Sequence, residues 1–136
     1  TNIQAAIGCA QLAKIDEILI RKRQLQDLYR TTLEKYGAVF QRLPKGSSSS
    51  YWMVGALFPS TDVNHFSDYL KQKNIDSRPF FSPVSGFRHI KYSNVDEFPN
   101  SKFLANYGLI FPSAPNLIDT SAVETVLSAI DGYFTN

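Results

Sequence analysis

The sequence is poor in cysteine, in net charge and in long apolar runs, and each shortage excludes a class of protein. Cys9 is the only cysteine among 136 residues, which excludes an internal disulfide and a cysteine-based metal site. The net charge of +2 is too small to indicate nucleic-acid binding. No apolar run approaches the roughly 18 residues of a membrane span. We therefore expect one globular domain in the cytoplasm, without metal, nucleic-acid or membrane partners.

Motifs of a self-sufficient active site are also lacking. There is no glycine-rich phosphate loop and no nucleophile elbow. The two histidines, His65 and His89, lack metal-ligand spacing, and the neighbouring Asp96 and Glu97 diverge on most backbones, which excludes paired-carboxylate catalysis. The sequence thus predicts no catalytic site within this chain alone.

The first 36 residues have the pattern of one long helix. Thr1 and Gln4 have the spacing of a capping box, no proline interrupts the segment, and Gly37 is a natural stop. A helix over residues 2–36 would be roughly 50 Å long, whereas a domain of this size is under about 40 Å across. The helix is therefore predicted to overhang its own domain. The alternative is a break at Gly8, with the first turns folded back.

The predicted overhang is apolar rather than polar. Ile3 and Ile7 favour burial, and the small residues between and after them allow another backbone to approach closely. We expect a further domain or a partner chain to cover this end.

The rest of the sequence alternates short strands and helices. Strands are predicted at 39–43, 51–58, 75–81 and 109–111, and helices at 63–73, 101–107 and 121–134. Pro79 places the third strand at an edge. The sum is an α/β (α+β) layered domain with a three- to four-stranded sheet, helices packed on one face, and the other face available to a neighbour.

Arg78 is the strongest candidate for a binding residue. It precedes two aromatic residues, Phe80 and Phe81, at a strand end, where a guanidinium can hold a phosphate or carboxylate beside a ring. The alternative is a surface salt bridge with Asp76. His89 lies in the long connection over residues 82–99 and is a second candidate, because loops of this length are often functional.

Several stretches resemble the DegT/DnrJ family of pyridoxal-phosphate (PLP) aminotransferases, perosamine synthetases included. The similar segments run the length of the chain: residues 1–8 (TNIQAAIG) with 10–12 (AQL), 50–53 (SYWM), 75–83 (IDSRPFFSP), 98–100 (FPN) and 107–113 (YGLIFPS). The resemblance implies that residues 1–136 are the C-terminal small domain of a fold-type I enzyme, with 1–36 as the interdomain helix. The large domain with the cofactor lysine is expected to be absent.

The same resemblance implies the function of the parent enzyme. Such an enzyme transfers an amino group, typically from glutamate, to a nucleotide-linked keto sugar for surface polysaccharide or lipopolysaccharide synthesis, and acts as a homodimer. Within this chain Arg78, Phe80, Phe81 and His89 are predicted to bind substrate, with no catalytic or cofactor-binding residue and no PLP bound. Val84 and Ser85 stand where the family often has a histidine contact.

Two other interpretations remain open from the residues alone. The chain is a non-enzymatic interaction module if the first helix pairs with itself or with a partner. It is a small-molecule regulatory domain if a ligand binds between the sheet and the 82–99 connection.

Overall fold

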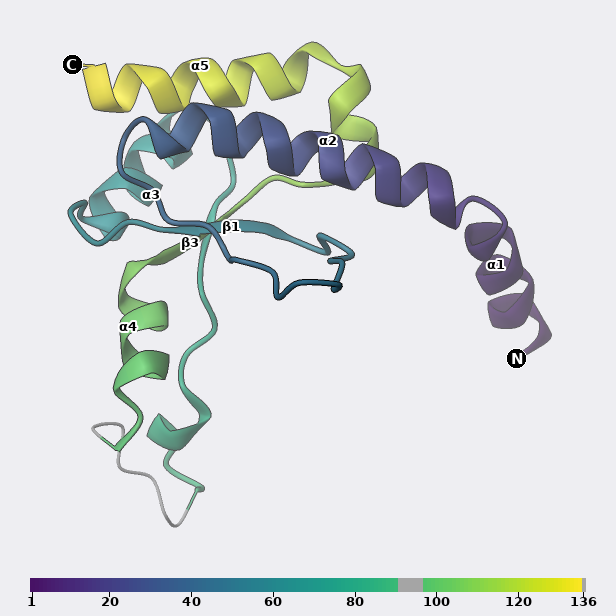
Figure 1. Cartoon of the computed structure of the whole chain (residues 1–136), viewed down its shortest axis with the longest axis horizontal. Coiled ribbons are helices and arrows are strands. Elements are labelled where there is room, and N and C mark those ends of the chain that lie inside the picture. The colour runs from purple at the N-terminus through teal and green to yellow at the C-terminus, as the bar shows by residue number, and fades with distance from the viewer. Residues whose placement is uncertain (91–96, 136) are drawn as a thin grey trace.

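The computed structural model describes residues 1–90 and 97–135 of the chain, so Asp96 lies outside the described residues. Within these ranges helices flank a small antiparallel sheet, and the N-terminal helix lies apart from it (Figure 1). In chain order the elements are α1 (Asn2–Leu12), α2 (Ile15–Glu34), β1 (Val54–Leu57), α3 (Val63–Gln72), β2 (Arg78–Pro79), the 3-10 turn η1 (Val84–Gly86), α4 (Pro99–Tyr107), β3 (Gly108–Phe111), η3 (Pro115–Asp119) and α5 (Ser121–Thr135). The strand order is β1-β3-β2.

One face of the sheet packs against three helices and carries the hydrophobic core. Leu109 and Phe111 of β3 are buried there, together with apolar residues of α2, α3 and α5. Figure 1 shows α5 and α2 side by side across this face. The largest buried side chains come from all of these elements: Tyr29, Phe58, Phe66, Leu25, Leu33, Leu70, Leu109, Ile130 and Val54. The predicted α/β class, with a sheet of three strands within the described residues, is confirmed.

Local signals explain the best-predicted elements. The Asp62 carboxylate caps α3 by accepting from the backbone N–H groups of Asn64 and His65 at 3.0 and 3.2 Å. Asn74 ends this helix at φ 59°, as expected for a left-handed helix terminus. The predicted edge position of Pro79 is also confirmed, because within the described residues β2 pairs with β3 alone.

The prediction of one continuous helix over residues 2–36 is wrong. The first helix ends at Leu12, Lys14 leaves helical geometry with φ −112° and ψ 11°, and α2 starts again at Ile15 in a new direction (Figure 1). Asp16 and Glu17 fall in the first turn of α2, where carboxylates stabilise the positive end of the helix dipole. The break therefore lies before this acidic pair and not at Gly8.

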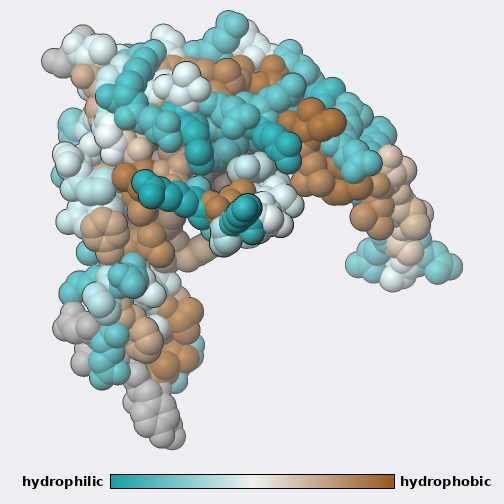
Figure 2. All heavy atoms as spheres, viewed as in Figure 1, coloured by the Kyte–Doolittle hydropathy of each residue, from teal (hydrophilic) through white to brown (hydrophobic). Residues whose placement is uncertain are grey.

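The first helix is not covered by the rest of the chain. Ile3 is 74% exposed and Ile7 is 59% exposed, and α1 contains no buried residue. Figure 2 shows hydrophobic residues gathered where α1 meets α2. The expected apolar overhang is confirmed, although it is formed by a separate helix.

The strands are shorter than predicted. The segment 39–43 contributes one isolated bridge, Val39 to Leu57, and forms no strand. The strand predicted at 51–58 begins only at Val54, because Tyr51 has φ 47° and the next two residues bend. The strand predicted at 75–81 is reduced to Arg78 and Pro79.

The described ranges contain neither a membrane-spanning helix nor a metal-ligand cluster. None of the helices there is both long and apolar enough to span a bilayer. No cluster of three His, Cys, Asp or Glu side chains suited to a metal ion occurs among those residues. His65 instead contacts the Tyr133 hydroxyl through Nδ1 at 2.9 Å.

Candidate functional site on the open face of the sheet

The register of the sheet brings predicted binding residues onto its open face. Gly55 of β1 and Arg78 of β2 both lie opposite Ile110 of β3, and opposed residues of antiparallel strands point to the same face. Phe80 continues this register, because its N–H donates to the Gly108 carbonyl at 3.0 Å. Arg78 and Phe80 therefore occupy the face that α2, α3 and α5 leave open.

The Phe80 ring lies directly on the backbone of two glycines. A Cβ added at Gly55 would lie 2.7 Å from Phe80 Cε1, and one at Gly108 would lie closer still to the ring and 2.6 Å from the Leu104 carbonyl oxygen. Contacts this short are not tolerated in a packed structure. The missing side chains therefore determine where Phe80 lies, and with it the segment that carries Arg78.

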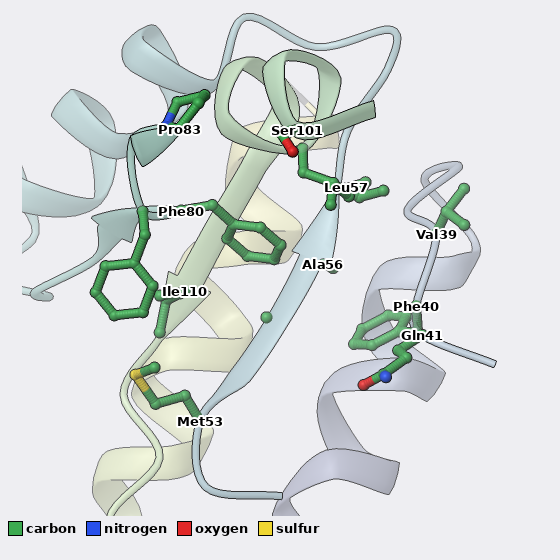
Figure 3. A pocket seen from close by; sticks show the side chains of 13 residues that line it. Val39, Phe40, Gln41, Met53, Ala56, Leu57, Phe80, Pro83, Ser101 and Ile110 are labelled. Atoms are coloured by element: carbon green, nitrogen blue, oxygen red, sulfur yellow. The ribbon is translucent and has the colours of Figure 1, made fainter. Parts of the chain in front are cut away.

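Phe80 forms one wall of an apolar cavity of about 590 Å³ (Figure 3). Among the described residues that line it, only Gln41 and Ser101 have polar side chains. The others come from the sheet face, the bridge segment, the segment after β2 and α4: Val39, Phe40, Met53, Gly55, Ala56, Leu57, Phe80, Phe81, Pro83, Leu104 and Ile110. A concave apolar surface with a few polar groups is the usual form of a small-molecule site.

Arg78 is at the edge of this face and is largely free of the protein. Its side chain is 77% exposed, and its contact with Asp76 is long, 3.4 Å from Nε to Oδ2. An exposed pair of this kind contributes little to stability. The guanidinium fork is therefore available to bind an anionic group, although the pairing with Asp76 anticipated from the sequence is also present.

The remaining predicted binding residues are divided between two places. Phe81 is 74% exposed and lines the apolar cavity beside Phe80. His89 is exposed, stacks on Phe87 with ring centroids 5.8 Å apart, and is not among the lining residues. The structure thus brings Arg78, Phe80 and Phe81 to one face and does not bring His89 to them.

A second, polar cavity of about 260 Å³ adjoins the first and was not predicted from the sequence. The two share Gln41, Met53 and Gly55. The polar cavity is further lined by residues of α2 and of the segment before β1: Gln26, Arg30, Leu43, Ser49, Ser50, Tyr51 and Trp52. A glutamine beside the apolar stripe of a helix gives no clear signal of burial, which explains why Gln26 was missed.

The rim of the polar cavity is held by Lys22. Its Nζ donates to the Trp52 carbonyl at 2.7 Å and also to the Ser113 carbonyl, so one amine ties α2 to the start of β1 and the end of β3, which lie side by side. Partial burial lowers the pKa of this lysine from its ordinary value. Tyr51 keeps a positive φ of 47° next to this contact, a conformation that costs a bulky residue about 1 kcal/mol or more.

The side chains that line the two cavities offer few reactive groups. No lysine, aspartate or glutamate is among the described residues that line either of them. Arg30 is the one charged side chain on these walls, and its Nε lies 3.8 Å from a Glu34 carboxylate oxygen. The open face can therefore bind and orient a ligand, but its walls offer no amine nucleophile and no carboxylate base.

Two curated relatives resemble the chain over nearly all its length. GDP-perosamine synthase of Escherichia coli O157:H7 is 32% identical over 138 residues, which cover 100% of this chain and 37% of that protein. GDP-perosamine synthase of Vibrio cholerae is 31% identical over 140 residues, which cover 98% of this chain and 37% of that protein. The chain thus spans little more than a third of the length of these relatives.

Solved structures share the fold at lower sequence identity. A DegT DnrJ EryC1 StrS aminotransferase from Brucella abortus superposes with a TM-score of 0.85 at 20% identity, over 98% of this chain and 36% of that one. S. venezuelae DesV, solved in complex with a ketimine intermediate, superposes with a TM-score of 0.86 at 17% identity, over the same shares. The model of the DegT/DnrJ/EryC1/StrS aminotransferase family matches residues 1–131, and the chain belongs to that family.

Proposed function

We propose that this chain is the small domain of a PLP-dependent aminotransferase that aminates a nucleotide-linked keto sugar. The observation that carries the proposal is the family match over residues 1–131, combined with an open apolar sheet face that presents Arg78, Phe80 and Phe81 together. The two relatives named GDP-perosamine synthase make a GDP-linked sugar the first substrate to test.

The cofactor does not fit the residues that the open face provides. PLP acts as an electron sink for amino-group transfer and is held by a lysine, with an acidic partner for its ring nitrogen. Neither cavity has a lysine or a carboxylate among its described lining residues. We therefore assign the cofactor to residues outside this open face and derive no chemical step for the chain itself.

The proposed contribution of this chain is to bind and shelter the substrate. Arg78 is exposed and only weakly paired, so its guanidinium can bind a phosphate of the nucleotide. Phe80 and Phe81 supply an apolar wall that excludes water and strengthens such charge-assisted contacts. His89, exposed and stacked on Phe87, remains a predicted contact made from the connection after η1.

The exposed apolar side of α1 supports the proposed assembly. Ile3, Ile7 and Leu12 are 74%, 59% and 67% exposed, and burying side chains of this size against another surface is favourable by about 1.5–3 kcal/mol each. We propose that α1 packs against the cofactor-binding part of the protein or against a second subunit of a homodimer. The amino donor is proposed to be glutamate, the location cytoplasmic, and the product a precursor of surface polysaccharide.

The test is an amination assay on the complete protein that contains this chain. We expect glutamate-dependent amination of a GDP-linked keto sugar, measured by chromatography of the nucleotide products. The isolated 136-residue chain should retain no PLP after gel filtration, judged by visible absorbance. Retention of PLP by the isolated chain, or no amination of any nucleotide-linked keto sugar by the complete protein, would contradict the proposal.

Arg78→Ala tests the binding role within that assay. We expect the KM for the nucleotide sugar to rise at least about 10-fold, because a charge-assisted contact contributes roughly 1.5–3 kcal/mol. The thermal stability should be unchanged, since the Asp76 pair is exposed. Asp76→Ala is the matched control and should leave KM within about twofold.

A further inference from the structure

The polar cavity contains a buried side chain whose hydrogen-bonding groups are unused. Gln26 of α2 is only 7% exposed. Its side-chain amide makes no hydrogen bond to any other residue in the ranges 1–90 and 97–135. The amide is not among the buried polar atoms that lack a hydrogen-bond partner in these ranges, so it is open to the solvent of the cavity. A ligand that enters the cavity can therefore pair with the donor and the acceptor of the amide without displacing a protein partner.

The walls around Gln26 indicate what kind of ligand this is. Trp52 is 70% exposed at the cavity, with Tyr51 beside it, and exposed aromatic rings favour flat ring systems by stacking. The hydroxyls of Ser49 and Ser50 add further hydrogen-bonding groups. The cavity therefore offers aromatic rings for stacking and an amide that carries both a hydrogen-bond donor and an acceptor. A planar heterocycle with adjacent donor and acceptor groups would match both features.

The charges at this cavity disfavour a free phosphate. Arg30 is the single charged residue among the described lining residues, and its Nε, which has no hydrogen-bond partner there, is buried and out of reach of a ligand. Its Nη2 donates to the Gln41 carbonyl at 3.4 Å, its Nε lies 3.8 Å from Glu34, and its Cζ lies 5.3 Å from the centre of the Phe40 ring. Because Glu34 offsets the charge of Arg30, the cavity is suited to a neutral polar ring rather than to an anion.

We propose that the polar cavity is a nucleobase subsite in which Gln26 pairs with adjacent donor and acceptor groups of the base and Trp52 stacks on its ring. The proposal rests on the proposed function in that the nucleotide of the sugar substrate supplies the base. The cavity adjoins the apolar cavity through Gln41, Met53 and Gly55, so one ligand can extend from the base subsite across the open face.

Trp52 is the only tryptophan of the chain, which makes the subsite directly observable. We expect guanosine, which carries no phosphate, to quench the fluorescence of the 136-residue chain in a saturable manner. Gln26→Leu should raise the dissociation constant at least about 10-fold, as expected for the loss of a bidentate base contact. Gln24→Leu is the matched control on the exposed side of α2 and should bind as the unchanged chain does.

A second measurement guards against a folding defect. Far-ultraviolet circular dichroism must show that Gln26→Leu is folded, and the indole N–H signal of Trp52 in NMR spectra should shift with guanosine only when Gln26 is present. Ribose 5-phosphate, which has no base, should cause neither change. Quenching by ribose 5-phosphate would identify a phosphate site and overturn the proposal, as would absence of saturable binding by guanosine, uridine, thymidine and adenosine at millimolar concentration.

The outcomes separate this proposal from the proposed function. If the complete protein aminates nucleotide sugars with the same KM after Gln26→Leu, the subsite is wrong and the enzyme assignment stands. If the isolated chain binds a nucleoside through Gln26 but the complete protein aminates no nucleotide-linked keto sugar, the subsite stands and the enzyme assignment is wrong.

Discussion

Two neighbouring residues of β3 face opposite environments. Leu109 is fully buried under the helices, whereas Ile110 faces the apolar cavity and is only partly covered. The covered face is filled by interlocking rings, such as Phe66 edge-on to Phe58 with centroids 5.4 Å apart. On the open face the Phe80 ring instead lies on glycine backbone and borders the apolar cavity.

The difference separates what maintains the fold from what is available for binding. Side chains on the covered face lose almost all contact with water, so each contributes the full hydrophobic free energy of burial. Side chains on the open face keep part of their surface free and are available to a ligand. Substitutions on the first face should therefore reduce stability, and substitutions on the second should reduce binding.

The largest expected effect is a loss of stability from a substitution on the covered face. A substitution of the next residue of β3, on the open face, is its matched control. Leu109→Ala should reduce the free energy of unfolding by about 2–5 kcal/mol, because it leaves a cavity in a packed core. Ile110→Ala removes a side chain of similar size from the open face and should cost about 1 kcal/mol. Urea denaturation measures both, and equal losses would show that the two faces are not distinct.

The next largest loss of stability is expected from a side chain added beneath the Phe80 ring. Gly55→Ala should destabilise the chain by about 1–3 kcal/mol, because the new methyl group overlaps the ring. In a Phe80→Ala background the same substitution should cost little, which a double-mutant cycle measures directly. Gly8→Ala in α1 is the control: no atom lies within 4 Å of the added Cβ, and helix propensity predicts a gain of up to about 1 kcal/mol.

The sequence predicted those elements whose signals are local. The cap at Asp62, the stripe of Val63, Phe66 and Leu70, and the edge position of Pro79 depend on neighbours in the chain. The continuity of the first helix was mispredicted because Ala13 and Lys14 are good helix formers and nothing but the acidic pair after them indicates a new start. Strand ends were mispredicted because pairing partners limit a strand and a single sequence does not name them.

Part of the candidate site was also predictable, because its signals too are local in the sequence. Arg78, Phe80 and Phe81 are adjacent in sequence, so one segment with a recognisable pattern predicted all three. The glycines under Phe80 lie 28 and 25 positions away, from 108 − 80 and 80 − 55, and only the sheet register brings them together. A glycine inside a predicted strand is the one signal that could have indicated them.

The smallest expected effect on stability comes from an ion pair between the C-terminal end of α2 and α5. Lys35 Nζ lies 2.9 Å from Asp131 Oδ1, and the Tyr36 hydroxyl donates to the same oxygen at 3.0 Å. The hydrogen bond from Lys35 lowers the pKa of Asp131 below its usual 3.8, and the bond to Asp131 raises the pKa of Lys35 above 10.5. The pair is exposed, so its contribution is small.

The sign of the pH dependence follows from these shifts. Because the folded pKa of Asp131 is depressed, its contribution is present above pH 3.8 and is lost as the pH falls through the lower, folded value. Because the folded pKa of Lys35 is raised, its contribution is present below pH 10.5 and is lost above the folded value. Thermal melts should show a slightly smaller loss of Tm at acid pH for Asp131→Asn than for the unchanged chain, and an identical loss would contradict the assignment.

The Phe80 ring rests on main-chain atoms, and every polypeptide has the same main chain. Outward-facing side chains elsewhere on β1 and β3 can therefore be exchanged without altering the support of that ring, provided that Gly55 and Gly108 remain. Descendants of one ancestral domain would thus be free to diversify residues 81–86, and with them the ligand preference, while the anchor point of the segment stayed fixed.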